Sequence, residues 1–526
     1  MSALCPVSMA HQVLFTQELL EAIFSQLSTG MQHPDDTPED VQERAELRRT
    51  LARAARVCQT FREAALNVLW CALDNIVPLL RLLPEFQERE SEWMLTDAIT
   101  EEGWTRLLLH ARRIRGLCHY RGTAIDPGVW AMLLTRSEGH LMPRLRVLDI
   151  SEIPIPDFPF VLLTLCPSLS ELYLSFQDDS GPNGRALPSI AAILIPSIVQ
   201  IASDLTILYL DEHFPVPSES IASLERLSRL KELKLCDPET TVCAVGLRAI
   251  SRLESLRVLS IEDLRLYGAN VELADGLKSL ETLYVHGSPG DIRILVQGSR
   301  FVALKHFDIM VHCEDGILPA ESLASTVSSL PQTVHKLRLG FCDGDNTNPP
   351  SCSVADILQL VQPLKELTHI SLDNGMRRIT MSDADIKVLF DQWPRLHHFT
   401  LDEDKDRPRD LSVSQPTYAT LLDIATRCPD LESFAATYFD ATSLPATVDV
   451  PAVPRHLRSL VFEYFLGDTP PESIARIIHL LFPSLDIEHD AALAAAASPR
   501  PGTRLWSLVL DALKTLRAQE RGASGV

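Results

Sequence analysis

The sequence predicts an elongated α/β protein in which a strand and a helix recur along the chain as one repeating unit. A phrase of leucine, two residues, leucine, one residue and leucine returns twelve times between residues 145 and 462, at first-position spacings of 24 to 36 residues. An amphipathic helical segment follows most of these phrases. A chain of 526 residues also exceeds one compact core unless its units contact only their neighbours. These observations favour a repeat array over a single globule.

Residues within each phrase alternate, so that apolar positions face an interior and the others face solvent, as a short strand requires. Proline before several phrases ends the preceding helix. A strand plus a helix in each unit is typical of the leucine-rich repeat family in its longer, helix-bearing form. A closed αβ barrel would need strands buried on both faces. We therefore expect a solenoid with a curved parallel sheet and outer helices over residues 114–490. The copies begin at Ile114 (a worn copy), Leu145, Leu169, Leu205, Leu230, Leu256, Leu280, Leu304, Val334, Leu367, Leu396, Leu431 and Leu457.

Before the array, residues 13–75 are expected to form a small helical domain, after a disordered segment at 1–12. Apolar residues follow helical spacing over residues 13–27. Thr37, Pro38 and the acids behind them predict the start of a second helix. A third amphipathic piece begins at Phe61. Residues 76–113 are expected to be a helical linker to the array.

Three segments of this domain, ELLEAIFSQL at 18–27, ARVCQTF at 55–61 and LW at 69–70, together resemble the F-box motif. The resemblance implies docking on a Skp-family linker subunit and, through it, on a cullin-based ubiquitin ligase. Two departures are Thr16, where the family usually has proline, and a lengthened connection over residues 28–50. The residues that the resemblance assigns to this interface or its support are Leu19, Leu20, Ile23, Leu27, Val57, Phe61 and Trp70.

At the other end, the segment from Phe482 is expected to be a last, imperfect strand. Residues 491–526 should contain an alanine-rich connector and an amphipathic helix. Because the open end of a solenoid must be covered, we expect this helix to be the cap.

Composition limits the class of partner. The formal net charge of −22 makes nucleic acid an unlikely main ligand, since phosphate binding requires a basic face. None of the eleven cysteines forms a C-x-x-C pair, which leaves zinc and redox sites without support. An odd number of thiols in apolar settings indicates a reducing compartment. No stretch predicts a signal peptide or a membrane span. We expect a cytoplasmic or nuclear protein.

No motif predicts catalysis. Asp343–Asn346 resembles the start of a calcium loop, but Asn348 and Val354 stand where that loop needs glycine and glutamate. The acidic run 402–406 is expected to be a solvated loop. His397 and His398 should point to opposite faces of a strand, which disfavours joint metal binding. We therefore expect no enzyme, no catalytic residue, no cofactor and no metal.

What remains is the solvent-facing side of the strands. Tyrosine combines apolar area with a hydrogen-bonding tip and suits partner contact. Carboxylates in the same rows indicate a partner segment of basic character, although ordinary solvated strand positions are the alternative. The sequence thus predicts a substrate adaptor of a ubiquitin ligase, with a protein-binding scaffold outside any ligase as the alternative. The candidate substrate-binding residues are Tyr173, Tyr209, Tyr284, Asp211, Glu262 and Asp308.

Overall fold

The computed structural model divides the chain into two compact units, Met1–Leu256 and Arg257–Val526. The residues that it describes are 17–27, 37–119, 124–177, 186–269, 271, 273, 276–313, 318–343, 352–373, 379–402, 415–445, 447, 456–490 and 503–523. Several predicted features lie outside these residues. They are the segment 1–12, Thr16, the connection 28–36, the calcium-like turn after Asp343, most of the acidic run 402–406 and the connector 491–502.

The first unit begins with three helices, α2 (Gln17–Ser25), α3 (Pro38–Ala54) and α4 (Gln59–Leu69). The predicted start of α3 is confirmed by a capping box. The Asp40 N–H donates to Thr37 Oγ1 at 3.2 Å, and the Thr37 N–H donates to the Asp40 carboxylate at 2.9 Å. The helices close over a common apolar core made by Leu20, Phe24, Leu51, Ala55, Ala64 and Ala65.

The segment after α4 differs from the expected helical linker. It contains β1 (Ala72–Leu73), α5 (Val77–Leu80), an antiparallel hairpin of β2 (Phe86–Arg89) and β3 (Glu92–Leu95), and α6 (Glu101–Ala111). Glu90 and Ser91 at the hairpin turn both have positive φ, 51° and 71°. Tight hairpin turns need this conformation, and sequence expectations look for glycine or asparagine there. The ring of Trp93 stacks on Phe86 at 5.1 Å and stabilises the pair.

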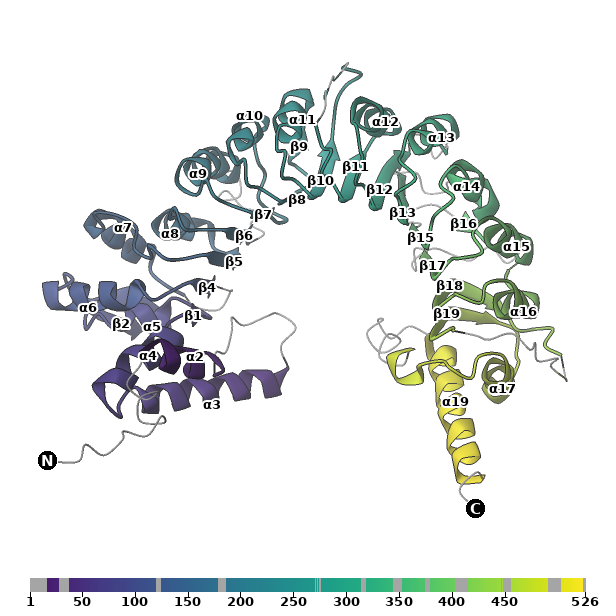
Figure 1. Cartoon of the computed structure of the whole chain (residues 1–526), viewed down its shortest axis with the longest axis horizontal. Helices are drawn as coiled ribbons and strands as arrows, with labels where there is room; N and C mark the ends of the chain where they lie inside the picture. The colour runs from purple at the N-terminus through teal and green to yellow at the C-terminus, as the bar shows by residue number, and fades with distance from the viewer. Residues whose placement is uncertain are drawn as a thin grey trace, which may run out of the picture. The chain divides into compact units, whose positions relative to one another are not determined.

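Parallel strands continue the first unit in the order β1-β4-β5-β6-β7-β8. The helices lie along one side of these strands (Figure 1). The strands are β4 (Gly116–His119), β5 (Val147–Ile153), β6 (Glu171–Phe176), β7 (Ile207–Leu210) and β8 (Glu232–Leu235), with a short β9 (Thr241–Val242) beyond them. The helices are α7 (Pro127–Arg136), α8 (Phe158–Thr164), α9 (Leu187–Ile201), α10 (Ser218–Ser223) and α11 (Ala244–Ser251), with 3-10 turns at Ile155–Asp157 and Leu224–Arg226.

The second unit repeats this arrangement in the order β10-β11-β12-β13-β15-β17-β18-β19. Its strands are β10 (Val258–Leu264), β11 (Thr282–Gly287), β12 (His306–Cys313), β13 (Lys336–Asp343), β15 (His369–Asp373), β17 (His398–Asp402), β18 (Ser433–Asp440) and β19 (Ser459–Leu466). Its helices are α12 (Pro289–Gly298), α13 (Ala320–Ser328), α14 (Val354–Val361), α15 (Asp383–Gln392), α16 (Tyr418–Arg427) and α17 (Pro471–Leu481). A separate bridge joins β14 (Cys352–Ser353) to β16 (Ile379–Thr380).

One register connects the strands of each unit, and all twelve predicted phrases form strands. Equivalent apolar positions pair from strand to strand with side chains at most 2 % exposed. In the second unit this buried line contains Leu283, Phe307, Leu337, Ile370, Phe399, Phe434 and Leu460. Both units are therefore leucine-rich repeat arrays, with parallel strands on one side and helices on the other.

The carboxyl end corrects one expectation. The segment from Phe482 turns, and residues 487–490 are helical rather than a strand. Asp490 instead covers the free edge of β19. Its carboxylate accepts hydrogen bonds from Ser459 Oγ at 2.7 Å and from the Leu460 N–H at 3.2 Å. Helix α19 (Thr503–Ala523) packs on α17 and β19, with Trp506 only 2 % exposed.

Candidate functional site

The helices at the start of the first unit separate the predicted interface residues into two groups. Leu19 and Ile23 are 44 % and 48 % exposed, and Val57 is 67 % exposed. Leu20 is buried in the core. The other three candidates, Leu27, Phe61 and Trp70, are half-buried. The structure therefore presents three apolar side chains to solvent beside a core that is already closed.

Two of the half-buried residues have partners inside the unit. Phe61 meets the edge of Phe24 at a centroid distance of 5.6 Å. Trp70 lies against His110 of α6 at 4.5 Å, so it links the helical start to the first repeat. Arg113 adds an ion pair to Glu63 at 2.6 Å. These contacts support the fold and leave Leu19, Ile23 and Val57 as the surface group.

The solvent-facing side of strands β6 to β8 carries the first two predicted tyrosines. The rings of Tyr173 and Tyr209 meet edge to face at 6.1 Å, because the two residues are register partners. Lys234, the next partner, places its ammonium 5.0 Å from the Tyr209 ring centroid. The Tyr209 hydroxyl donates to Asp211 at 3.3 Å. Burial, Cys236 and Asp211 raise the pKa of Tyr209, so its hydroxyl stays neutral and can donate.

The third tyrosine belongs to the second unit, where Tyr284 is the register partner of Asp308 and Asp308 of Arg338. The Arg338 guanidinium lies 3.8 Å from Asp308 and 2.7 Å from Asp373. Burial raises the pKa of Asp308 to about 6, although Arg338 opposes the shift. Burial beside Glu262 and Asp308 also raises the pKa of Tyr284. Much of the predicted acidic character is therefore neutralised within the face.

The negative charge of Glu262 is balanced as well, by the imidazole of His286. Its carboxylate lies 3.3 Å from Nδ1 of His286, whose ring stacks on His312 at 4.1 Å. Burial would lower the pKa of His286, but the neighbouring Cys342 sulfur and Glu262 carboxylate raise it to about 9. The raised pKa keeps the His286 imidazole positively charged beside the Glu262 carboxylate at neutral pH.

A row that the sequence analysis missed faces the same side of the second unit. His306, Lys336, His369 and His398 are register partners at the first residue of β12, β13, β15 and β17. They occupy the third position of the phrase, whereas the predicted tyrosines occupy the fifth. Side chains of a strand alternate between its two faces, so the third position, the fifth position and the residue just beyond the phrase lie on one face. The repeat pattern was therefore enough to predict this row. We call these four residues the histidine row.

Next to the histidine row, a hollow of about 830 Å³ opens where β13, β15, β17 and β18 begin. Its wall contains more basic than acidic side chains. The residues that line it are His335, Lys336, Lys365, Glu366, Leu367, Thr368, Trp393, Pro394, Arg395, His397 and Asp430. We call it the basic hollow.

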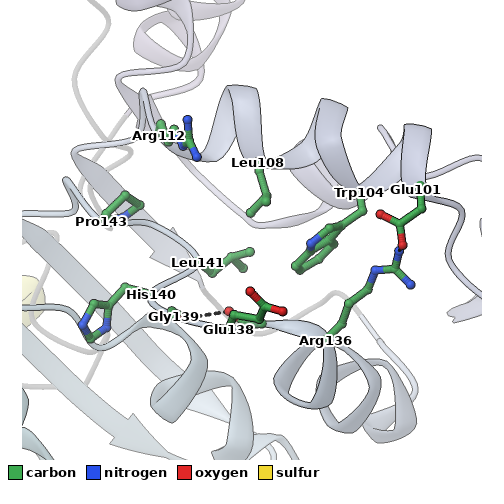
Figure 2. A pocket seen from close by; sticks show the side chains of 11 residues that line it. Glu101, Trp104, Leu108, Arg112, Arg136, Glu138, Gly139, His140, Leu141 and Pro143 are labelled. Carbon is green, nitrogen blue, oxygen red and sulfur yellow. Dashed lines mark hydrogen bonds and ion pairs between the residues drawn. The ribbon is translucent and has the colours of Figure 1, made fainter.

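A second hollow, of about 520 Å³, lies in the first unit between α6 and the segment that follows α7. Figure 2 shows Arg136 directed toward Glu101, with Trp104 beside them. The Arg136–Glu101 ion pair measures 2.5 Å, and the guanidinium carbon lies 5.7 Å from the Trp104 ring centroid. His140 contacts the Leu165 carbonyl oxygen at 3.0 Å. These contacts join α6 to α7 and favour a structural role for this hollow.

The solved structures that match this chain do so at low sequence identity and low TM-score. No protein-family model and no curated protein matches the chain. Among solved structures, an internalin (inlF) from Listeria monocytogenes shows 14 % identity over 62 % of this chain and 82 % of its own, with a TM-score of 0.31. A TLR13–ssRNA13 complex shows 14 % identity over 71 % and 43 %, with a TM-score of 0.32. The leucine-rich repeat-containing protein LegL7 from Legionella pneumophila shows 12 % identity over 64 % and 98 %, with a TM-score of 0.33.

Two further observations concern only the residues that the structure describes. None of their helices combines the length and the apolar character needed to cross a membrane. Nowhere in the described ranges do three histidine, cysteine or acidic side chains converge as metal ligands, although His369 stacks on both His398 and His397 at 4.3 and 6.5 Å.

Proposed function

We propose that this protein is a substrate-recognition adaptor of a cullin-based, SCF-type ubiquitin ligase. In this proposal the helices α2 to α4 dock on a Skp-family linker subunit, and the repeats hold a protein substrate. The observation that carries it is the group of Leu19, Ile23 and Val57, which stay exposed beside a closed core. Large apolar side chains that stay exposed on a closed helical domain are candidates for contact with a partner.

Helix α2 carries apolar residues on two sides. A helix needs a second apolar side only when it packs against a second partner. Leu20 and Phe24 are buried against α3 and α4. Leu19 and Ile23 lie one turn apart and share the other face, because residues four apart are neighbours on a helix. This face supports the F-box resemblance at the positions where the motif implies linker contact.

The proposed mechanism is positional. An adaptor raises the effective concentration of substrate lysines near a ubiquitin-charged enzyme that another subunit holds. No residue of this chain needs to make or break a bond. The proposal includes a cytoplasmic or nuclear location, where such ligases act.

The deciding experiment is co-purification of the full chain with a Skp-family subunit. The double variant Leu19→Asp with Ile23→Asp should lose the linker subunit while the thermal unfolding midpoint stays close to that of the wild type. Leu20 is left intact, because charging a buried core residue would unfold the domain. The matched control is Val245→Asp with Val302→Asp, which charges exposed valines outside α2 to α4 and should keep the linker subunit. A double variant that still co-purifies would contradict the proposed docking face.

A second candidate is a repeat scaffold that binds partners outside any ligase. The lengthened connection between α2 and α3 and the replacement of the motif's proline by Thr16 favour it. Absence of a Skp-family subunit from wild-type preparations would select this function.

Under either candidate function, the tyrosines on the solvent-facing side of the strands should contribute to partner binding. Changing Tyr173, Tyr209 and Tyr284 to alanine should abolish capture of a native partner without affecting linker binding.

A further inference from the structure

The basic hollow of the second unit gathers three cations on one wall. Several cations elsewhere in this unit are paired. Arg338 contacts Asp373 at 2.7 Å, Lys305 contacts Glu281 at 2.7 Å and Arg427 contacts Asp391 at 2.8 Å. Lys336, Lys365 and Arg395 line the hollow, are exposed, and form no ion pair with any residue that the structure describes.

The wall of the hollow is rigid and amphipathic. The indole of Trp393 is 1 % exposed and donates from Nε1 to the Leu364 carbonyl oxygen at 2.7 Å. His335 contacts the Glu366 carbonyl oxygen at 3.1 Å. The lining contains two carboxylates, Glu366 and Asp430, against the three cations, so these five side chains together carry one excess positive charge. This excess is notable in a chain with a formal net charge of −22.

The histidine row lies on the face of the sheet next to the hollow. Burial, together with repulsion by His398, Lys336, His397 and His306, lowers the pKa of His369 to about 4. Burial, Lys336 and Arg338 lower the pKa of His306. Burial, His397 and Lys336 lower the pKa of His398, although Glu432 opposes the shift. The three imidazoles are therefore neutral at pH 7, with burial as the largest cause and the positive charge of Lys336 as an added one.

We infer that the basic hollow and the histidine row together bind an acidic segment of the protein partner. Three unpaired cations around a hollow are complementary to several anionic groups held on one chain, such as clustered carboxylates or phosphorylated side chains. A basic segment would meet the same cations unpaired and would be repelled. This inference rests on the substrate-capture half of the proposed function and is independent of the linker subunit.

An anion beside the histidine row has a measurable consequence. A bound anion would stabilise the protonated form of the imidazoles. In the free protein, repulsion by His398, Lys336, His397 and His306 opposes protonation of His369. Binding then takes up protons, so affinity must rise as pH falls. Glu432, 3.6 Å from His397, already neutralises part of that end of the row. The effect is therefore centred on His369 and His398.

The test uses the full chain without any linker subunit, and its readout is the fluorescence anisotropy of labelled peptides. The probes are a hexaglutamate peptide, a peptide with two phosphoserines, and hexalysine as the basic control. We expect an acidic probe to bind more tightly than hexalysine. Lys365→Glu with Arg395→Glu should weaken that binding about tenfold, from two reversed surface charges. Arg144→Glu with Lys231→Glu makes the same charge change at exposed positions of the first unit and should leave binding unchanged.

A second variant examines the histidines. His369→Gln with His398→Gln should bind the acidic probe like the wild type at pH 8 but should lose the strengthening seen at pH 6. The inference is overturned if hexalysine binds as tightly as the acidic probes, or if neither acidic probe binds. It is also overturned if the Lys365→Glu and Arg395→Glu variant binds like the control. Each of these results leaves the co-purification with the linker subunit unaffected, so failure of the two proposals can be told apart.

Discussion

The imidazole ring of His369 lies on that of His398, with the ring centroids 4.3 Å apart and the ring planes 19° apart. The two residues are register partners on β15 and β17, and His306 and Lys336 continue the same line on β12 and β13. Parallel strands in one register thus bring together side chains that are about 30 residues apart in sequence. The result is a strip of imidazoles around Lys336 on one face of the second unit.

The first prediction concerns the titration of His369. We expect it to gain its proton near pH 4 instead of near the ordinary 6.5. Hydrogen exchange at the imidazole C2 position, followed by mass spectrometry, measures this midpoint for each histidine. His398→Gln removes one repelling neighbour and should move the midpoint upward. An unchanged midpoint would show that burial alone sets the shift.

The same shift has a consequence for stability. Between pH 6.5 and about 4 the unfolded chain binds a proton at His369 that the folded chain does not bind. The contribution of this residue to the free energy of unfolding is therefore full above pH 6.5 and is lost as the pH falls through that window. His369→Gln should reduce the loss, measured as the urea midpoint at pH 7 and pH 5. A larger drop in the variant would contradict the assigned sign.

A third prediction concerns the cap. Trp506 is buried against Phe465 and Phe462, with ring centroids 5.8 and 6.3 Å away. Trp506→Ala leaves a cavity at the open end and should cost about 3–5 kcal/mol. Leu508→Ala on the same helix is the control, because Leu508 is 46 % exposed and its loss should cost less than about 0.5 kcal/mol. Urea unfolding of the full chain checks both, and equal effects would mean that α19 does not cap the array.

A fourth prediction concerns the glycine that ends β11. A Cβ at Gly287 would lie 2.9 Å from the Leu264 carbonyl oxygen, so backbone has to move. Gly287→Ala should therefore destabilise the second unit by about 1–3 kcal/mol. Gly290 in α12 is the matched control, since the nearest atom to its added Cβ is Ser288 Oγ at 3.9 Å. Gly290→Ala should be neutral or stabilising by up to about 1 kcal/mol, because alanine favours a helix. In urea unfolding of the full chain, the midpoint of Gly287→Ala should therefore be lower than that of Gly290→Ala.

Local patterns predicted much of the fold. The twelve phrases predicted twelve strands, since alternation and spacing are enough to specify one buried face. Thr37, Pro38 and Asp40 predicted the start of α3 because capping needs only neighbouring residues. The hairpin at 86–95 was not predicted, because Glu90 and Ser91 are unusual turn residues. The strand expected from Phe482 was wrong, since Asp490 supplies the hydrogen bonds that another strand would have supplied.

The sequence by itself determined the repeat and the buried leucines. Only the tertiary structure decided which candidate side chains are available. Leu19 and Leu20 are adjacent in sequence and equally apolar, yet one is exposed and the other belongs to the core. Likewise, Arg338 is paired between Asp308 and Asp373, whereas Lys336 two residues earlier forms no ion pair with a residue that the structure describes. Exposure and charge pairing depend on neighbours that are distant along the chain, and register alone brings these together.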